Sequence, residues 1–103
     1  MFIRLWRYRV PIEHRGQFEA AYGPDGPWID LFARADGYLG TELYQPVGGA
    51  ADATNWITGD QWADRRDWEH FLATWQTDYD ALDRQLEGIA LDETELFAGD
   101  VDG

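Results

Sequence analysis

The sequence predicts an α+β fold in the order strand, broken helix, strand, strand, helix, strand. Residues 62–86 repeat apolar side chains every three or four positions, which places them on one face of a long helix. Residues 2–10, 38–45 and 54–62 alternate in the way that strands do. Glycines and prolines at 23–27 break the helical region between the first two strands. This order is typical of a ferredoxin-like four-stranded antiparallel sheet with its helices on one face.

The long helix is the clearest element. Asp64 is its predicted N-cap, Asp67 stands where a capping box has its acid, and Gly88 offers a stop. The apolar stripe of the helix consists of Trp68, Phe71, Leu72, Trp75, Tyr79, Leu82 and Leu86. Such a wide aromatic stripe must lie on another layer, which the predicted sheet supplies.

The remaining elements follow from alternation and from the chain breaks. We expect a strand over 2–10, helices over 12–22 and 28–34, and strands over 38–45 and 54–62 that pair antiparallel because their connection is short. Residues 46–53 are a predicted loop, and 89–97 the fourth strand. The domain is therefore expected to cover residues 1–99, with 100–103 as a frayed acidic tail.

Helices on one face leave the other face of the sheet bare. The first and third strands carry apolar residues on both faces, and their aromatic members are Phe2, Trp6, Tyr8, Trp56 and Trp62. A bare apolar sheet face is an interface signal. We therefore expect a symmetric homodimer in which two sheets pack face to face.

Composition excludes several classes of function. A net charge of −12 disfavours nucleic acid and anionic membrane surfaces, which both need a basic footprint. All 8 basic residues are arginine, which salt adaptation or codon bias in a GC-rich genome would each explain. The chain has no cysteine and no serine, so thiolate metal sites and Cys or Ser nucleophiles are excluded.

The sequence has no apolar run long enough for a membrane span and no signal-peptide layout at its start. A cytoplasmic location is the resulting expectation. The two histidines form no H-x-x-H or H-E-x-x-H pattern, and we expect no metal site.

Short motifs along nearly the whole chain resemble the antibiotic biosynthesis monooxygenase family of the dimeric α/β-barrel superfamily. They are Tyr8-Arg9-Val10, the run Phe18 to Pro24, Trp28 with Leu31-Phe32, the run Gly37 to Leu43, Asp60-Gln61-Trp62, and Tyr79-x-Ala81-Leu82-Asp83. The resemblance implies a homodimeric α/β barrel. It also implies a polycyclic phenol bound between sheet and helices, and oxidation without metal or flavin, because the deprotonated substrate itself reduces oxygen.

Haem-degrading relatives suggest a second chemistry, with a His and a Trp on the second helix and an Asn on the first strand. This chain has no Asn between Phe2 and Val10, and His70 sits near the start of its helix. We therefore expect no haem and no other cofactor.

Two residues are catalytic candidates. His70 is at the edge of the apolar stripe, where it would act as a general base oriented by Asp67, or would simply face solvent and pair with Asp67. Asn55 is an amide beside Trp56 in a strand largely built for packing. It would hold a phenolate or a reduced oxygen species, or would face solvent near the loop.

Aromatic residues are the candidate substrate pocket. Tyr22, Trp28 and Tyr38 surround the helix break, and Trp75 lies on the long helix; ordinary core packing is the alternative for this group. Arg4 would form an interface salt bridge, or bind an anionic substrate, with Glu42, Asp60, Glu93 and Glu95 as available partners.

The resulting function hypothesis is a cofactor-independent monooxygenase that oxidises a phenolic or polycyclic aromatic molecule with O₂. The alternatives are a non-catalytic domain of the same fold that binds a small ligand, and a purely structural dimer with a packed interior. The first hypothesis predicts an enclosed cavity between helices and sheet, the second a cavity without a polar group aimed at its centre, and the third a filled interior.

Overall fold

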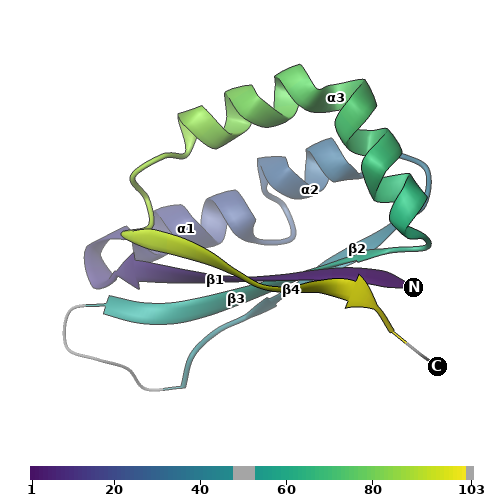
Figure 1. Ribbon diagram of the computed structural model, residues 1–103. Helices are drawn as coiled ribbons and strands as arrows, with labels where there is room; N and C mark the ends of the chain where they lie inside the picture. The colour runs from purple at the N-terminus through teal and green to yellow at the C-terminus, as the bar shows by residue number, and fades with distance from the viewer. Residues whose placement is uncertain (48–52, 102–103) are drawn as a thin grey trace.

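The computed structural model describes residues 1–47 and 53–101. Its strands are β1 (Phe2–Pro11), β2 (Tyr38–Tyr44), β3 (Ala53–Trp62) and β4 (Asp92–Asp100). They form one antiparallel sheet in the order β2-β3-β1-β4, so the first strand is central and the last lies at an edge (Figure 1). The predicted sheet is confirmed. Most of the predicted 46–53 loop lies outside the described residues.

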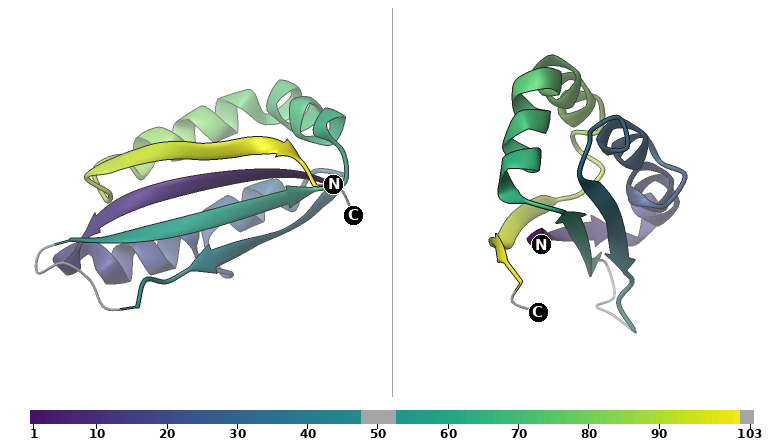
Figure 2. Two further views of the ribbon diagram at one scale, coloured as in Figure 1. Left: turned by 60° about the horizontal axis from the view of Figure 1, so that its bottom comes forward. Right: turned by 90° about the vertical axis from the view of Figure 1, so that its right-hand side faces the viewer.

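The helices all lie on one face of the sheet, as the sequence predicts (Figures 1 and 2). They are α1 (Arg15–Tyr22), α2 (Pro27–Phe32) and α3 (Arg65–Gln85), with a 3₁₀ turn over Ile12–His14 before α1. The chain between α1 and α2 turns sharply at Gly26. A Cβ there would come within 2.5 Å of the carbonyl oxygen of Ala21, so this close approach requires glycine.

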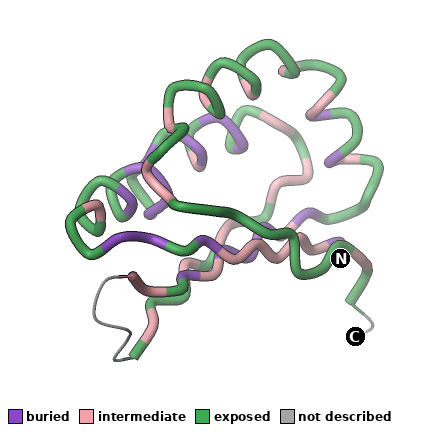
Figure 3. The backbone as a smooth tube through the Cα atoms, turned by 60° about the vertical axis from the view of Figure 1, so that its left-hand side comes forward, coloured by how far each residue is buried: buried purple, intermediate pink, exposed green. Residues whose placement is uncertain are grey.

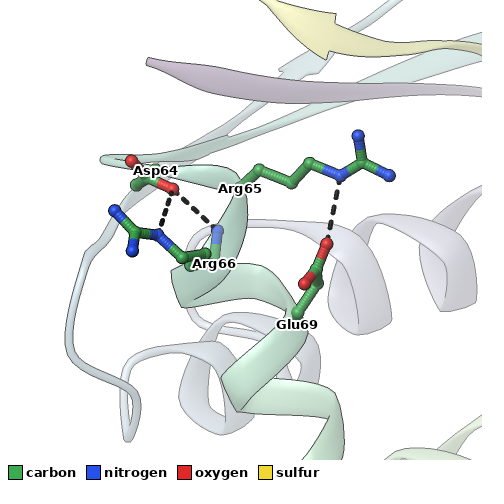
Figure 4. A network of polar contacts seen from close by, with 4 residues as sticks. All are labelled: Asp64, Arg65, Arg66 and Glu69. Atoms are coloured by element: carbon green, nitrogen blue, oxygen red, sulfur yellow. Dashed lines mark hydrogen bonds and ion pairs between the residues drawn. The ribbon is translucent and has the colours of Figure 1, made fainter.

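The start of α3 is fixed by the predicted N-cap. The side chain of Asp64 accepts a hydrogen bond from the Arg66 backbone N–H at 2.8 Å, and Arg65 pairs with Glu69 one turn on (Figure 4). Asp67 does not complete a capping box among the described residues; its side chain lies against Gly37 instead. The helix is kinked at Trp75, whose backbone leaves the helical region (φ −118°, ψ 27°).

The core lies between the helices and the covered face of the sheet (Figure 3). Its largest fully buried side chains are Trp56, Trp62, Phe18, Phe71 and Val10. Strand alternation puts Phe2, Trp6, Tyr8, Trp56 and Trp62 on this covered face. The expectation that these aromatics form a bare face was therefore wrong, because their strands present alternate residues to the helices.

The open face of the sheet carries a different apolar set. Alternation and register place Ile3, Leu5, Ile57, Tyr44 and Phe97 there, and Tyr44 and Phe97 are about half exposed. Leu5 and Tyr44 converge over Gly59, where a Cβ would lie 3.1 Å from Leu5 and 3.7 Å from Tyr44. The sheet therefore has a second apolar surface, uncovered in the single chain.

Strand β4 begins three residues later than the sequence predicts. Ile89 and Ala90 pack against the core from the preceding loop, and β4 itself is exposed along most of its length (Figure 3). Asp100 pairs with Phe2, and the Val101 N–H donates to Met1 O at 2.8 Å. The ordered strand thus extends past the expected domain end at Gly99. Across residues 1–47 and 53–101, no helix combines the length and the hydropathy of a membrane span.

Replacing Trp62 with alanine should destabilise the fold by about 3–5 kcal/mol, because its buried ring touches residues of α2, α3 and β2. Urea denaturation measures the change. The matched control is Leu39→Ala, at a position that is 56% exposed, for which we expect a change of about 0.5 kcal/mol or less. Equal effects of the two substitutions would contradict this assignment of the core.

Candidate functional site

A cavity of about 50 Å³ lies between the helices and the covered face of the sheet, and it is partly open. This volume holds roughly three to five water molecules, and it is smaller than the ~300–1,000 Å³ of typical small-molecule sites. Its walls are largely aromatic, formed by Trp6, Tyr8, Tyr22, Trp28, Phe32 and Tyr79. The interior is therefore not completely filled by side chains, and the unfilled space is lined by rings.

Asp60 is the buried acid of this cavity. It lies on the covered face of β3, opposite Arg4 of β1 and Thr41 of β2, and is only 7% exposed. One carboxylate oxygen accepts a hydrogen bond from the Thr41 hydroxyl at 2.9 Å, and the same hydroxyl lies 2.5 Å from that of Tyr38. Burial raises the pKa of Asp60 to about 6, against the opposing effects of the Thr41 hydrogen bond and the Arg4 charge.

Arg4 is the cation of the cavity wall. Its guanidinium forms a 2.8 Å ion pair with Glu95 and lies 4.1 Å from the ring centroid of Trp68. The Arg4 side chain is 11% exposed, whereas that of Glu95 is 43% exposed, so the ion pair is partly open to water. The sequence left two roles open for Arg4, an interface salt bridge and the binding of an anionic substrate. In the structure its ion-pair partner, Glu95, belongs to the same chain, and Arg4 lines the cavity.

Tyrosine hydroxyls add neutral polar groups. Burial raises the pKa values of Tyr8, Tyr22 and Tyr79 above that of a free tyrosine. These hydroxyls stay protonated at neutral pH. They are therefore available to donate hydrogen bonds to a ligand in the cavity.

The predicted pocket residues are divided by the structure. Tyr22 and Trp28 line the cavity, and Tyr38 reaches it through its contact with Thr41. Trp75 stacks on Phe71, with 5.8 Å between ring centroids, and is not among the lining residues.

The two predicted catalytic residues lie elsewhere. His70 is exposed on α3, and Asn55 is exposed on β3 with the alternation of the open face. Neither side chain lines the cavity. The structure thus does not bring His70 and Asn55 together with the aromatic pocket, and their catalytic roles stay predictions.

The sequence identifies Asp60 as part of the Asp60-Gln61-Trp62 motif and as a possible partner of Arg4, but not as a cavity residue. A signal was present, because Asp60 takes a covered-face position in a strand whose other such positions hold Thr54, Trp56, Thr58 and Trp62. Only a charge with a partner or a function is expected at such a position.

Residues that could hold a metal or haem are not gathered at the cavity. Among residues 1–47 and 53–101, no three side chains of His, Asp or Glu are grouped to bind a metal ion. No histidine lines the cavity, and its volume does not accommodate a porphyrin. The residues present therefore do not fit a haem group.

Comparisons with known proteins place the fold. No protein-family model matches the sequence, and no curated protein sequence matches it. A solved structure of a mutant of MhuD from Mycobacterium tuberculosis, with two manganese protoporphyrin IX bound per active site, is similar at a TM-score of 0.71. It has 14% identity and covers 98% of this chain and 94% of that chain.

Two further similar structures come from Streptomyces. SnoaB of Streptomyces nogalater, a cofactor-independent oxygenase, has a TM-score of 0.65 and 14% identity over 97% of this chain and 95% of its own. The ActVA-Orf6 monooxygenase of Streptomyces coelicolor, in complex with nanaomycin D, has a TM-score of 0.62 and 16% identity over 99% and 88%. The chain has the fold of an antibiotic biosynthesis monooxygenase domain. At these identities the likeness establishes the fold alone.

Asp60→Asn should stabilise the domain at pH 7.5 by on the order of 3 kcal/mol. The folded-state pKa of about 6 is above the ~3.9 of an unfolded aspartate, so the folded state favours protonated Asp60. Its contribution to stability is present below pH ~4 and is lost as pH rises through about 6. Urea denaturation at several pH values should show the variant's advantage shrinking towards pH 4. A variant less stable than the parent at pH 7.5 would contradict this.

Proposed function

We propose that this protein is a cofactor-independent monooxygenase that oxidises a phenolic or polycyclic aromatic molecule with O₂, and that it belongs to the antibiotic biosynthesis monooxygenase family. The observation that carries the proposal is the aromatic cavity with one buried carboxylate, Asp60, in its wall. The aromatic walls can stack against the flat rings of a substrate, and oxidation of a phenol requires a base that removes its hydroxyl proton. The fold shared with SnoaB and ActVA-Orf6 supports the same reaction class.

Asp60 is the proton acceptor in this proposal. With a pKa of about 6 it is mostly ionised at neutral pH, and a proton taken from the substrate hydroxyl would remain on a buried group. The Thr41 hydrogen bond holds one carboxylate oxygen and leaves the other for the substrate. Arg4, in the same wall, stabilises the phenolate that forms.

The oxidation then needs no further protein group. The phenolate supplies electrons to O₂, one oxygen atom enters the product as a carbonyl, and the other leaves as water. The substrate loses two hydrogens in this step, so atoms and electrons balance. The protein binds the ring, removes the first proton and limits access of water.

The alternative function is a small-ligand-binding domain without redox chemistry. The small volume of the cavity favours it, because a polycyclic substrate would have to displace side chains to enter. In that case a ligand binds and no oxygen is consumed.

A homodimer is part of the proposal. The open face gathers Leu5, Ile57, Tyr44 and Phe97, which would be buried if two sheets packed face to face. A cytoplasmic location also remains a prediction.

With a panel of polycyclic phenols, an oxygen electrode should record uptake by the parent protein, and Asp60→Asn should lower the rate by roughly 10²-fold or more. The control is Asp80→Asn, an equal charge change on the exposed side of α3, with an unchanged rate. No uptake by the parent protein with any of the phenols would refute the oxygenase. Loss in His70→Gln with full activity in Asp60→Asn would assign the base to His70.

Light scattering should give a dimer for the parent chain at micromolar concentration and a monomer for Phe97→Glu, because a charge buried in an apolar interface is costly. The control Ala73→Glu adds the same charge on the exposed side of α3 and should stay dimeric. A monomeric parent chain would defeat the proposed dimer.

A further inference from the structure

A second hollow adjoins the aromatic cavity and shares part of its lining. It has a volume of about 260 Å³ and lies between the end of α3 and the start of β4. Tyr22, Asp83 and Glu93 line both spaces. The site thus has an inner aromatic compartment and a larger outer compartment, with these three residues where the two meet.

The junction carries two carboxylates that lack a cation. Asp83 comes from α3 and Glu93 from β4, and both are exposed. Partial desolvation, and after it repulsion from Asp83, raises the pKa of Glu93. Among the described residues, neither carboxylate is in an ion pair. Like charges brought together without a counter-ion are destabilising, so a ligand that supplies a positive charge would be favoured here.

The inner compartment is also acidic on balance, because Asp60, Asp83 and Glu93 line it against one guanidinium. Asp60 is a buried carboxylate that, within the described part of the chain, has no ion-pair partner. The one guanidinium of the inner wall, Arg4, is already paired with Glu95. Around Asp60 stand aromatic rings, whose faces attract cations. The carboxylates and the ring faces therefore both favour a cationic ligand.

The outer compartment does not reverse this balance. Arg84 is its one cationic lining residue, whereas Asp83, Glu87, Asp92 and Glu93 are acidic. Of these acids, Asp92 is paired with Arg9. An anionic ligand would meet a net negative wall along the whole path.

We propose that the site takes a phenol that bears a protonated amine, with its ring in the inner compartment and its ammonium group between Asp83 and Glu93. The proposal rests on the proposed function in using the same cavity, and it narrows the substrate class to aromatic ammonium cations. The ammonium group removes the repulsion at the junction. It also offsets the negative wall against which a phenolate must form.

Titration calorimetry with two probes of equal ring structure tests the proposal. Tyramine carries the ammonium group, and 4-(2-hydroxyethyl)phenol has a neutral hydroxyl in its place. We expect tyramine to bind roughly tenfold more tightly to the parent protein, and Asp83→Asn and Glu93→Gln each to remove most of this difference. Asp80→Asn is the matched control on the same helix and should bind like the parent.

Three results would overturn the proposal: equal affinity for the two probes, tyramine affinity unchanged in both junction variants, or no binding of tyramine to the folded parent protein. The outcome is separate from that of the oxygenase. Tyramine binding without any oxygen uptake would refute the oxygenase and leave this inference standing. Oxygen uptake with neutral phenols but no tyramine binding would support the oxygenase and refute this inference.

Discussion

The ring of Phe32 joins the layers of this protein. It lies 5.2 Å from Phe71 of α3, 5.8 Å from Trp62 of β3 and 5.5 Å from Tyr38 of β2, measured between ring centroids. A helix of 6 residues such as α2 is not stable alone, so this docking is what holds it in place. Because Trp28 is on the same short helix, the wall of the cavity depends on the same contact.

Periodicity was enough to predict the order of the elements and an antiparallel sheet with its helices on one face, because both depend on residue spacing. It failed where spacing carries little information. Strand β4 is exposed at the edge of the sheet and begins Asp92-Glu93-Thr94-Glu95, with no apolar alternation. The strand was therefore predicted to begin at the apolar residues Ile89 and Ala90, which precede it. The kink at Trp75 could not be predicted in the same way, because no glycine or proline lies near it in the helix.

The candidate site was only partly accessible to the same reasoning. Tyr22 and Trp28 could be named because a helix break beside a sheet leaves aromatic side chains around a gap. The meeting of Arg4, Thr41 and Asp60 could not, because it depends on the register of three strands, which only tertiary structure fixes. For Asn55 the alternation of its own strand already indicated the face opposite Trp56, and its polarity was given more weight than its position.

The kink at Trp75 divides α3 into two halves that are held differently. Its buried residues, Trp68 and Phe71, both precede the kink, whereas Tyr79 and Leu82 beyond it are only partly buried. Local opening requires less free energy where fewer apolar contacts are broken. Backbone amides after Trp75 should therefore exchange with solvent deuterium faster than those before it. The half that carries Tyr79 and Asp83 could then move outward and enlarge the cavity while the anchored half stays in place.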